Sequence, residues 1–117
     1  MPNPVVHFEI TGKDGPALQQ FYGDLFGWNI DANNEWQYGT VVAGEGGING
    51  GIAGDHEGGN RVTIYTAVDD LQAYLDKAER LGAKVLMPPT DMGIVEIAMF
   101  MDPGGNVAGL VKDAPAG

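Results

Sequence analysis

The sequence predicts an α+β fold in which a strand, a helix and three strands follow one another, and this order occurs twice. Three observations predict it: two segments carry apolar residues at the spacing of one helical face, strand-like runs surround both segments, and their ends match. Asp14 and Asp69 open the two predicted helices (69 − 14 = 55), and Gly27 and Gly82 close them (82 − 27 = 55). The shared offset favours a duplicated module over coincidence in a small α+β domain.

The first half opens with VVHFEI, residues 5–10, where His7 and Glu9 alternate with apolar side chains as in a strand. A helix is predicted next, because Asp14 is a suitable N-cap and Pro16 suits a first helical turn. We expect its aromatic residues and the tryptophan behind it to pack helix against sheet: Phe21, Tyr22, Phe26 and Trp28. Three further strand-like runs are WNID (28–31), WQYGTVVA (36–43) and GGINGGIAG (46–54).

The second half repeats this order, beginning with the strand-like run RVTIYTAV, residues 61–68. Asp69 or Asp70 is the expected N-cap of its helix, and Gly82 the expected stop. The apolar face of this helix consists of Leu71, Tyr74, Leu75 and Ala78. The strands that follow are AKVLMP (83–88), IVEIAMFM (94–101) and NVAGLVK (106–112), with the turn DPGGN before the last. The chain therefore predicts two modules, about residues 4–54 and 60–112, in a single domain over 1–117.

Composition excludes several classes of function. The formal net charge is −10, which repels nucleic acid and anionic membrane surfaces, so neither is an expected partner. No signal segment or long apolar run is present, and a cytoplasmic location is expected. The chain has no cysteine, so a metal site would need histidine, carboxylate or other oxygen ligands. The glycine-rich stretches lack the lysine of a phosphate loop and match no nucleotide fingerprint.

Five segments, in this order and spacing, resemble the glyoxalase / bleomycin-resistance / extradiol-dioxygenase superfamily, also called vicinal oxygen chelate proteins. They are HFEI, FYGDLFGW, VDDLQAYLDKAERLGAKV, PP and DPGGNVAGLV. The resemblance covers residues 5–111 and is closest to short bacterial members related to lactoylglutathione lyase. It implies two βαβββ modules whose sheets curl around a cleft, completed by a second copy in a homodimer. It does not select a function, because the superfamily includes isomerases, epimerases, dioxygenases, thiol transferases and drug-sequestering proteins.

The resemblance also implies where a metal would be held. Metal-dependent members take ligands from the first and last strands of each module. Those positions correspond to His7 and Thr63 on the first strands, with Val62 beside Thr63. On the last strands they correspond to Gly109 and to Ala53 or Gly54. Only His7 is a usual ligand, whereas a transition metal needs three or four protein ligands. We therefore expect no metal and no other cofactor, unless His56 or Glu57 in the following loop rebuilds a site with His7 and Glu9.

Three interpretations of His7 and Glu9 remain open: a structural polar pair, anchors for a ligand, or a metal-free acid/base pair. We rank ligand anchoring first. If the neighbouring strands alternate, Trp36 and Tyr38 share one face, while Thr63 and Tyr65 look inward with the pair. The predicted ligand-binding residues are His7, Glu9, Trp36, Tyr38, Thr63 and Tyr65. Core or interface packing is an equally good explanation for Trp36 and Tyr38.

The sequence favours a homodimeric, metal-free protein that binds a small organic molecule, aromatic or cationic, without the superfamily's usual metal-dependent activity. One alternative is a lyase, isomerase or dioxygenase of the same superfamily with a rebuilt metal site. Another is a non-catalytic scaffold that binds other proteins. The sequence leaves the identity of the ligand and the existence of a reaction undecided.

Overall fold

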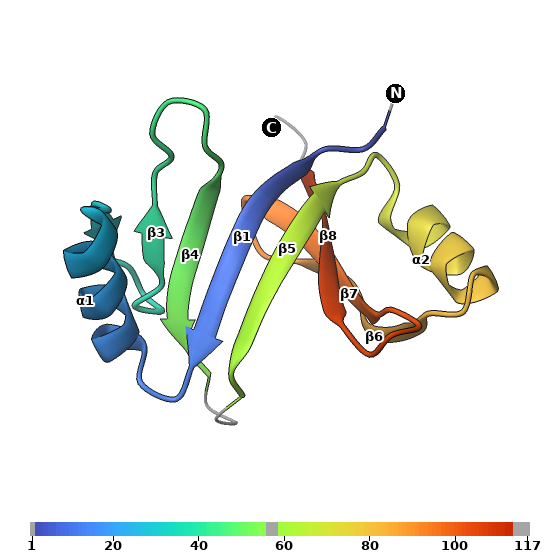
Figure 1. Cartoon of the computed structure of the whole chain (residues 1–117). Helices are drawn as coiled ribbons and strands as arrows, with labels where there is room; N and C mark the ends of the chain where they lie inside the picture. Colours follow the sequence, from blue (N-terminus) through green and yellow to red (C-terminus); the bar gives the residue numbers. More distant parts are fainter. Residues whose placement is uncertain (1, 56–58, 114–117) are drawn as a thin grey trace. The chain divides into compact units, whose positions relative to one another are not determined.

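The computed structural model describes residues 2–55 and 59–113, which fall into two compact units (Figure 1). The first unit is Val6–Thr63, and the second unit combines the start of the chain, up to Val5, with the residues from Ile64 onward. Each contains one helix and a sheet, so the fold is α+β, as predicted. Within the described ranges, no helix is long and apolar enough to cross a membrane. The predicted cytoplasmic location stays a prediction.

The first module contains the predicted strand, helix and three strands. Its elements are β1 (Val5–Gly12), α1 (Gly15–Phe26), β2 (Ile30–Asp31), β3 (Gly39–Val41) and β4 (Asn49–Gly54). Strand β4 runs parallel to β1, β3 is antiparallel to β4, and β2 is antiparallel to β3. Helix α1 packs against β4, and Figure 1 shows the helix at the side of the sheet formed by β3 and β4.

The second module repeats this topology. Its elements are β5 (Arg61–Ala67), whose first residues belong to the first unit, α2 (Leu71–Arg80), β6 (Lys84–Asp91), β7 (Val95–Met101) and β8 (Val107–Asp113). Strand β8 runs parallel to β5, and β7 lies antiparallel between β8 and β6. The βαβββ order predicted from the sequence is therefore confirmed for both modules.

Local capping explains where the helices begin and end. The Asp14 side chain accepts a hydrogen bond from the Ala17 backbone N–H at 3.1 Å, and α1 ends at Gly27 with a left-handed φ of 70°. In α2 the N-cap is Asp70, whose side chain accepts from the Ala73 N–H at 3.0 Å. Asp70 rather than Asp69 is thus the counterpart of Asp14, and the offset between the modules here is 70 − 14 = 56.

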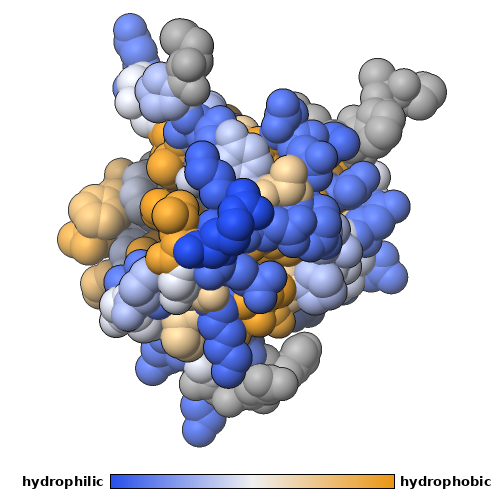
Figure 2. Space-filling view, turned by 90° about the vertical axis from the view of Figure 1, so that its right-hand side faces the viewer, coloured by the Kyte–Doolittle hydropathy of each residue, from blue (hydrophilic) through white to orange (hydrophobic). Residues whose placement is uncertain are grey.

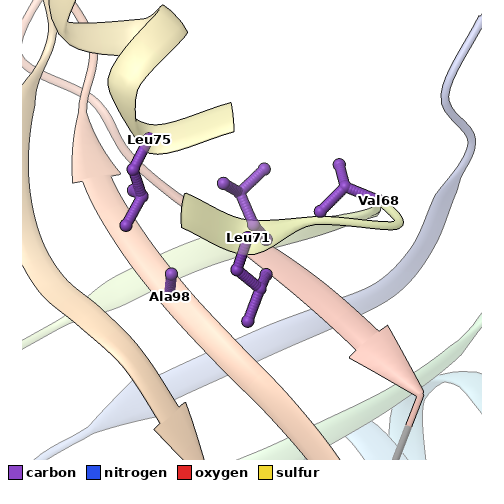
Figure 3. Close-up of a cluster of buried hydrophobic side chains, with 5 residues drawn as sticks. Val68, Leu71, Leu75 and Ala98 are labelled. Atoms are coloured by element: carbon purple, nitrogen blue, oxygen red, sulfur yellow. The ribbon is translucent and has the colours of Figure 1, made fainter. Parts of the chain in front are cut away.

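The second module has a packed hydrophobic core beneath its helix. Leu71 and Leu75 of α2 meet residues of the sheet, and Leu75 is only 1% exposed. Figure 3 shows the Leu75 side chain pointing from α2 toward Ala98 of β7, with Leu71 and Val68 farther along the same segment. The cluster consists of Val68, Leu71, Leu75, Ala98 and Leu110. Figure 2, which faces the side on which α2 lies, shows mainly hydrophilic residues with hydrophobic ones among them.

Helix α1 is packed differently. Its only buried residue is Gly15, and three large apolar side chains stay more than half exposed: Phe21 at 55%, Leu25 at 57% and Phe26 at 56%. The prediction that Phe21 and Phe26 pack helix against sheet is wrong in this respect, although Tyr22 and Trp28 are partly covered. The aromatic rings instead lie against one another, with Phe26 and Trp28 centroids 5.0 Å apart.

Candidate functional site

The candidate site begins on β1, which carries His7 and Glu9. Successive side chains of a strand point to opposite faces, so these two share a face while Phe8 and Ile10 lie on the other. Both polar side chains are partly buried. This arrangement agrees with the alternation seen in the sequence.

Tyr38 joins the two polar side chains of β1. Its hydroxyl donates a hydrogen bond to Glu9 Oε2 at 3.0 Å and lies 2.9 Å from His7 Nε2. A hydroxyl has a single hydrogen, so His7 Nε2–H donates to the tyrosine oxygen in this network. The imidazole and phenol rings are nearly parallel, at 15°, with centroids 6.4 Å apart. We call His7, Glu9 and Tyr38 the polar triad.

Burial and charge act in opposite directions on the imidazole. Partial burial lowers the pKa of His7 below its ordinary value of 6.5, and the Glu9 carboxylate opposes that shift. Burial is the larger effect, so the environment of His7 lowers its pKa and favours the neutral imidazole. A neutral imidazole and a bridging hydroxyl can exchange hydrogen bonds with a polar group of a ligand without bringing a full positive charge to the site.

Asn34 positions Tyr38, a role that the sequence pattern did not predict. Its side-chain oxygen accepts hydrogen bonds from the backbone N–H of Trp36 at 3.2 Å and of Tyr38 at 2.9 Å. Its amide nitrogen donates to the Tyr38 carbonyl at 2.7 Å. Asparagine is a frequent turn residue for this reason, and the pair Asn33-Asn34 ahead of Trp36 was the available signal.

Trp36 does not share a strand with Tyr38. Strand β3 begins only at Gly39, and Trp36 lies exposed in the turn before it. Gln37, between the two rings in sequence, has a φ of 54°, so the backbone there leaves the extended conformation. The expected alternation over residues 36–43 is therefore wrong at its start. The structure brings Tyr38 to the β1 pair and gives Trp36 no contact with it among the described interactions.

Tyr38 rests on a glycine of the neighbouring strand. Glu9 of β1 is paired with Gly51 of β4, and a Cβ atom built on Gly51 would come within 1.9 Å of the end of the Tyr38 ring. The missing side chain at position 51 therefore makes the room in which the ring lies. A larger residue there would displace the hydroxyl from His7 and Glu9.

The second module has a tyrosine over a glycine at the equivalent place. The offset of 56 between the helix caps makes Thr63 the counterpart of His7 (7 + 56) and Tyr65 the counterpart of Glu9 (9 + 56). Tyr65 is paired with Gly109 of β8, where an added Cβ would lie 2.3 Å from the tyrosine ring. By strand pairing, the residue of the first module that corresponds to Gly109 is Gly51, whereas the offset of 56 gives Ala53 (109 − 56), one of the two expected residues.

The side chains at these positions do not fit a metal ion. Thr63 is buried, and its hydroxyl has no hydrogen-bond partner among the described residues. At Gly109 a ligand side chain is absent, and the buried Tyr65 ring occupies the space it would need. Across residues 2–55 and 59–113, no three His, Asp or Glu side chains are grouped closely enough to hold a metal. The other considered ligands, His56 and Glu57, lie outside the described residues.

Comparison with known proteins places the chain in a family. Residues 5–110 match the Glyoxalase/Bleomycin resistance protein/Dioxygenase superfamily. A Mycobacterium tuberculosis protein described as "Putative glyoxylase CFP32" is 35% identical over 87% of this chain. The anthracycline biosynthesis protein DnrV of Streptomyces peucetius is 28% identical over 89%. The chain spans 42% and 45% of the lengths of these two relatives.

Solved structures show the same fold. A superfamily member from Vibrio splendidus 12B01 superposes with a TM-score of 0.67 at 16% identity, covering 96% of this chain and 100% of that one. The methylmalonyl-CoA epimerase of Streptomyces coelicolor gives a TM-score of 0.63 at 18% identity, covering 98% and 97%. The chain belongs to the Glyoxalase/Bleomycin resistance protein/Dioxygenase superfamily, as the sequence motifs predicted.

Proposed function

We propose that the protein binds a small organic molecule at the polar triad without a metal ion, and that it does so as a homodimer. The observation that carries the proposal is the Tyr38 hydroxyl, held between His7 Nε2 and Glu9 Oε2 at 2.9 and 3.0 Å. Specific small-molecule sites commonly combine apolar walls with a few well-placed polar groups. Tyr38 supplies both an aromatic ring and a hydroxyl.

The ligand positions of the family support the metal-free part of the proposal. Where metal-dependent members would place a carboxylate, this chain has Gly109 covered by Tyr65. A glutamate at that position would have to expel a buried ring before it could reach an ion. At the two metal-ligand positions of the second module, the chain therefore has only the hydroxyl of Thr63 and the bare backbone of Gly109.

A flat aromatic molecule that carries a protonated amine is the best first probe for the ligand. The Glu9 carboxylate and the acidic chain favour a cation, and the Tyr38 ring favours a flat aromatic molecule. The name of the relative DnrV refers to anthracycline biosynthesis, so daunorubicin, a fluorescent anthracycline with a protonated amine on its sugar, is a suitable compound to test.

The test is a titration of daunorubicin followed by its fluorescence, with calorimetry as a second method. We expect saturable binding that Tyr38→Phe weakens about tenfold, because the ligand loses an anchored hydroxyl worth on the order of 1 kcal/mol. Tyr74→Phe is the matched control: the Tyr74 hydroxyl accepts a hydrogen bond from Asn3 in the second module. Equal binding by Tyr38→Phe and wild type, or no saturable binding, would contradict the proposal for this probe.

Metal analysis tests the remaining alternative, an enzyme with a rebuilt metal site. Protein purified without chelator is expected to contain no stoichiometric Zn, Ni, Fe or Mn. A bound metal that His7→Ala removes would overturn the metal-free proposal, whatever the outcome of the daunorubicin titration.

A further inference from the structure

The first module exposes an apolar surface that the polar triad does not use. Three residues of α1 belong to it, Phe21, Leu25 and Phe26, each more than half exposed. Beside them, Trp28 leads from the helix to an open groove of about 400 Å³ in the same compact unit. The groove is lined mainly by Phe8, Trp28, Val41, Val42, Ile48 and Val62.

Aromatic contacts join the helix residues and the groove into one surface. The Trp28 ring lies 5.0 Å from Phe26 on the helix side and 5.5 Å from Phe8 on the groove side, centroid to centroid. Val42 and Val62, at the rim of the groove, are exposed. We call this continuous set, α1 with Phe21, Leu25 and Phe26 plus the groove around Trp28, the aromatic face.

We propose that the aromatic face is the surface through which two copies of this chain associate. A monomeric protein rarely exposes contiguous apolar patches larger than a few hundred Å², and the largest apolar patch on a protein is often an interaction site. A standard interface buries about 800 Å² on each partner, a little over half of it apolar. Phe21 and Phe26 alone leave roughly 200 Å² exposed, and the leucine and groove side chains add more.

A second copy is the partner favoured by the lengths of the relatives. In DnrV and in the Mycobacterium tuberculosis relative, more than half of the polypeptide lies outside the part that matches this chain. That excess is long enough to supply another unit of the same size within one polypeptide. A second copy of this chain provides such a unit between two polypeptides. This inference rests on the homodimer of the proposed function and names its surface.

The net charge of the chain predicts how dimerisation should depend on salt. Two copies carry a formal charge of −10 each and therefore repel one another. The aromatic face must therefore hold the copies together against that repulsion. Salt screens the repulsion, with a Debye length of about 10 Å at 0.1 M, and leaves apolar contacts in place. Association of two copies should tighten as salt rises, whereas binding of a basic partner protein would weaken.

The experiment is sedimentation equilibrium on the full chain at several protein and salt concentrations. We expect a dimer whose dissociation constant decreases as the NaCl concentration is raised from 50 to 500 mM. Leu25→Glu should increase this dissociation constant about tenfold or more, the size of effect expected for a central interface residue. Leu81→Glu is the matched control, since Leu81 in the second module is even more exposed, at 71%. Both substitutions add one negative charge to an exposed leucine, so only their place differs.

A fluorescence measurement gives an independent readout. The chain has two tryptophans, so Trp36→Phe leaves Trp28 of the aromatic face as the only one. Its emission should shift to shorter wavelength as protein concentration rises, and Leu25→Glu should abolish the shift.

Two results would overturn the inference: a monomer at every concentration, or a dimer that Leu25→Glu leaves as tight as Leu81→Glu does. Daunorubicin titration of the same variants separates this inference from the proposed function. If daunorubicin still binds in a triad-dependent way but Leu25→Glu does not weaken the dimer, only the proposal about the aromatic face is contradicted. A dimer that Leu25→Glu dissociates, with no binding in the wild type, supports the surface and contradicts the proposed site for this probe.

Discussion

In the second module α2 buries Leu71 and Leu75 against a cluster with Ala98 and Leu110, whereas in the first module α1 buries only Gly15. The strands beneath the helices explain this difference. Strand β4 has the sequence NGGIAG, with Ile52 as its one large apolar side chain, and the Phe8 ring occupies the space above Gly50. A duplicated order of elements thus does not ensure duplicated packing, because the partner strand decides how much of a helix is covered.

The same comparison holds for the polar residues. At equivalent positions the first module has His7 and Glu9 where the second has Thr63 and Tyr65. Each module places a tyrosine on a glycine of its last strand, but Tyr65 is buried, whereas Tyr38 is only partly buried and hydrogen-bonded to both β1 side chains. One module therefore uses the arrangement for packing and the other for a polar site.

The largest expected difference between the modules is in the helix leucines. Leu75→Ala should lower the free energy of unfolding by about 2–5 kcal/mol, since it opens a cavity in the core. Leu25→Ala should change it by less than about 0.5 kcal/mol in dilute protein, because Leu25 is mostly in solvent. Urea denaturation of the two variants checks this. A cost for Leu25→Ala that equals the Leu75→Ala cost at every protein concentration would show that α1 is buried.

The two glycines under tyrosine rings should differ in a second way. Gly109→Ala forces a Cβ into the buried Tyr65 ring and should cost about 1–3 kcal/mol of stability. Gly51→Ala meets the far end of the Tyr38 side chain, which can swing away, so it should cost less stability but break the polar triad. Unfolding curves and the His7 NMR resonances measure the two effects. An unchanged His7 environment in Gly51→Ala would contradict the role given to that glycine.

Two side chains that fix loops sharpen the comparison further. Asn34→Ala should lower stability by about 1 kcal/mol, since it removes hydrogen bonds to the backbone around Tyr38, and should weaken daunorubicin binding. Asp102 holds the DPGGN turn of the second module by accepting from the Gly104 and Asn106 N–H groups. Asp102→Ala is therefore the control: it should loosen that turn and leave binding unchanged. Binding lost equally in both variants would mean that the two loops act on the site through overall stability.

The smallest expected effects concern pH, and the two modules should respond in different ranges. Burial lowers the pKa of His7 in the folded state, so the unfolded chain binds a proton more readily, and stability should decline as pH falls below about 6.5. His7→Gln should remove that decline.

Hydrogen bonds from Asn106 lower the pKa of Asp102 in the second module below its ordinary 3.8. The stability that these hydrogen bonds contribute is lost only as pH falls through that lowered pKa. Thermal melts between pH 3 and 8 measure both, and a His7→Gln profile that matches the wild type would contradict the assignment.

The sequence by itself determined the order of the elements, both helix N-caps to within one residue, the end of α1 at Gly27, and the turn in which Gly105 has a φ of 94°. These features depend on residues a few positions apart, through side-chain spacing, capping and the steric freedom of glycine, so they can be predicted locally. The sequence motifs also predicted the superfamily to which the chain belongs, and the match over residues 5–110 confirmed that prediction.

Only the tertiary structure decided how the candidate site is assembled. Tyr38 reaches Glu9 and His7 across 29 and 31 residues of chain, because Asn34 fixes its loop and Gly51 leaves room for its ring. The exposure of Phe21, Leu25 and Phe26 likewise depends on a distant strand that is poor in side chains. Such contacts follow from which surfaces meet after the chain has folded, and the spacing of neighbouring residues carries no information about them.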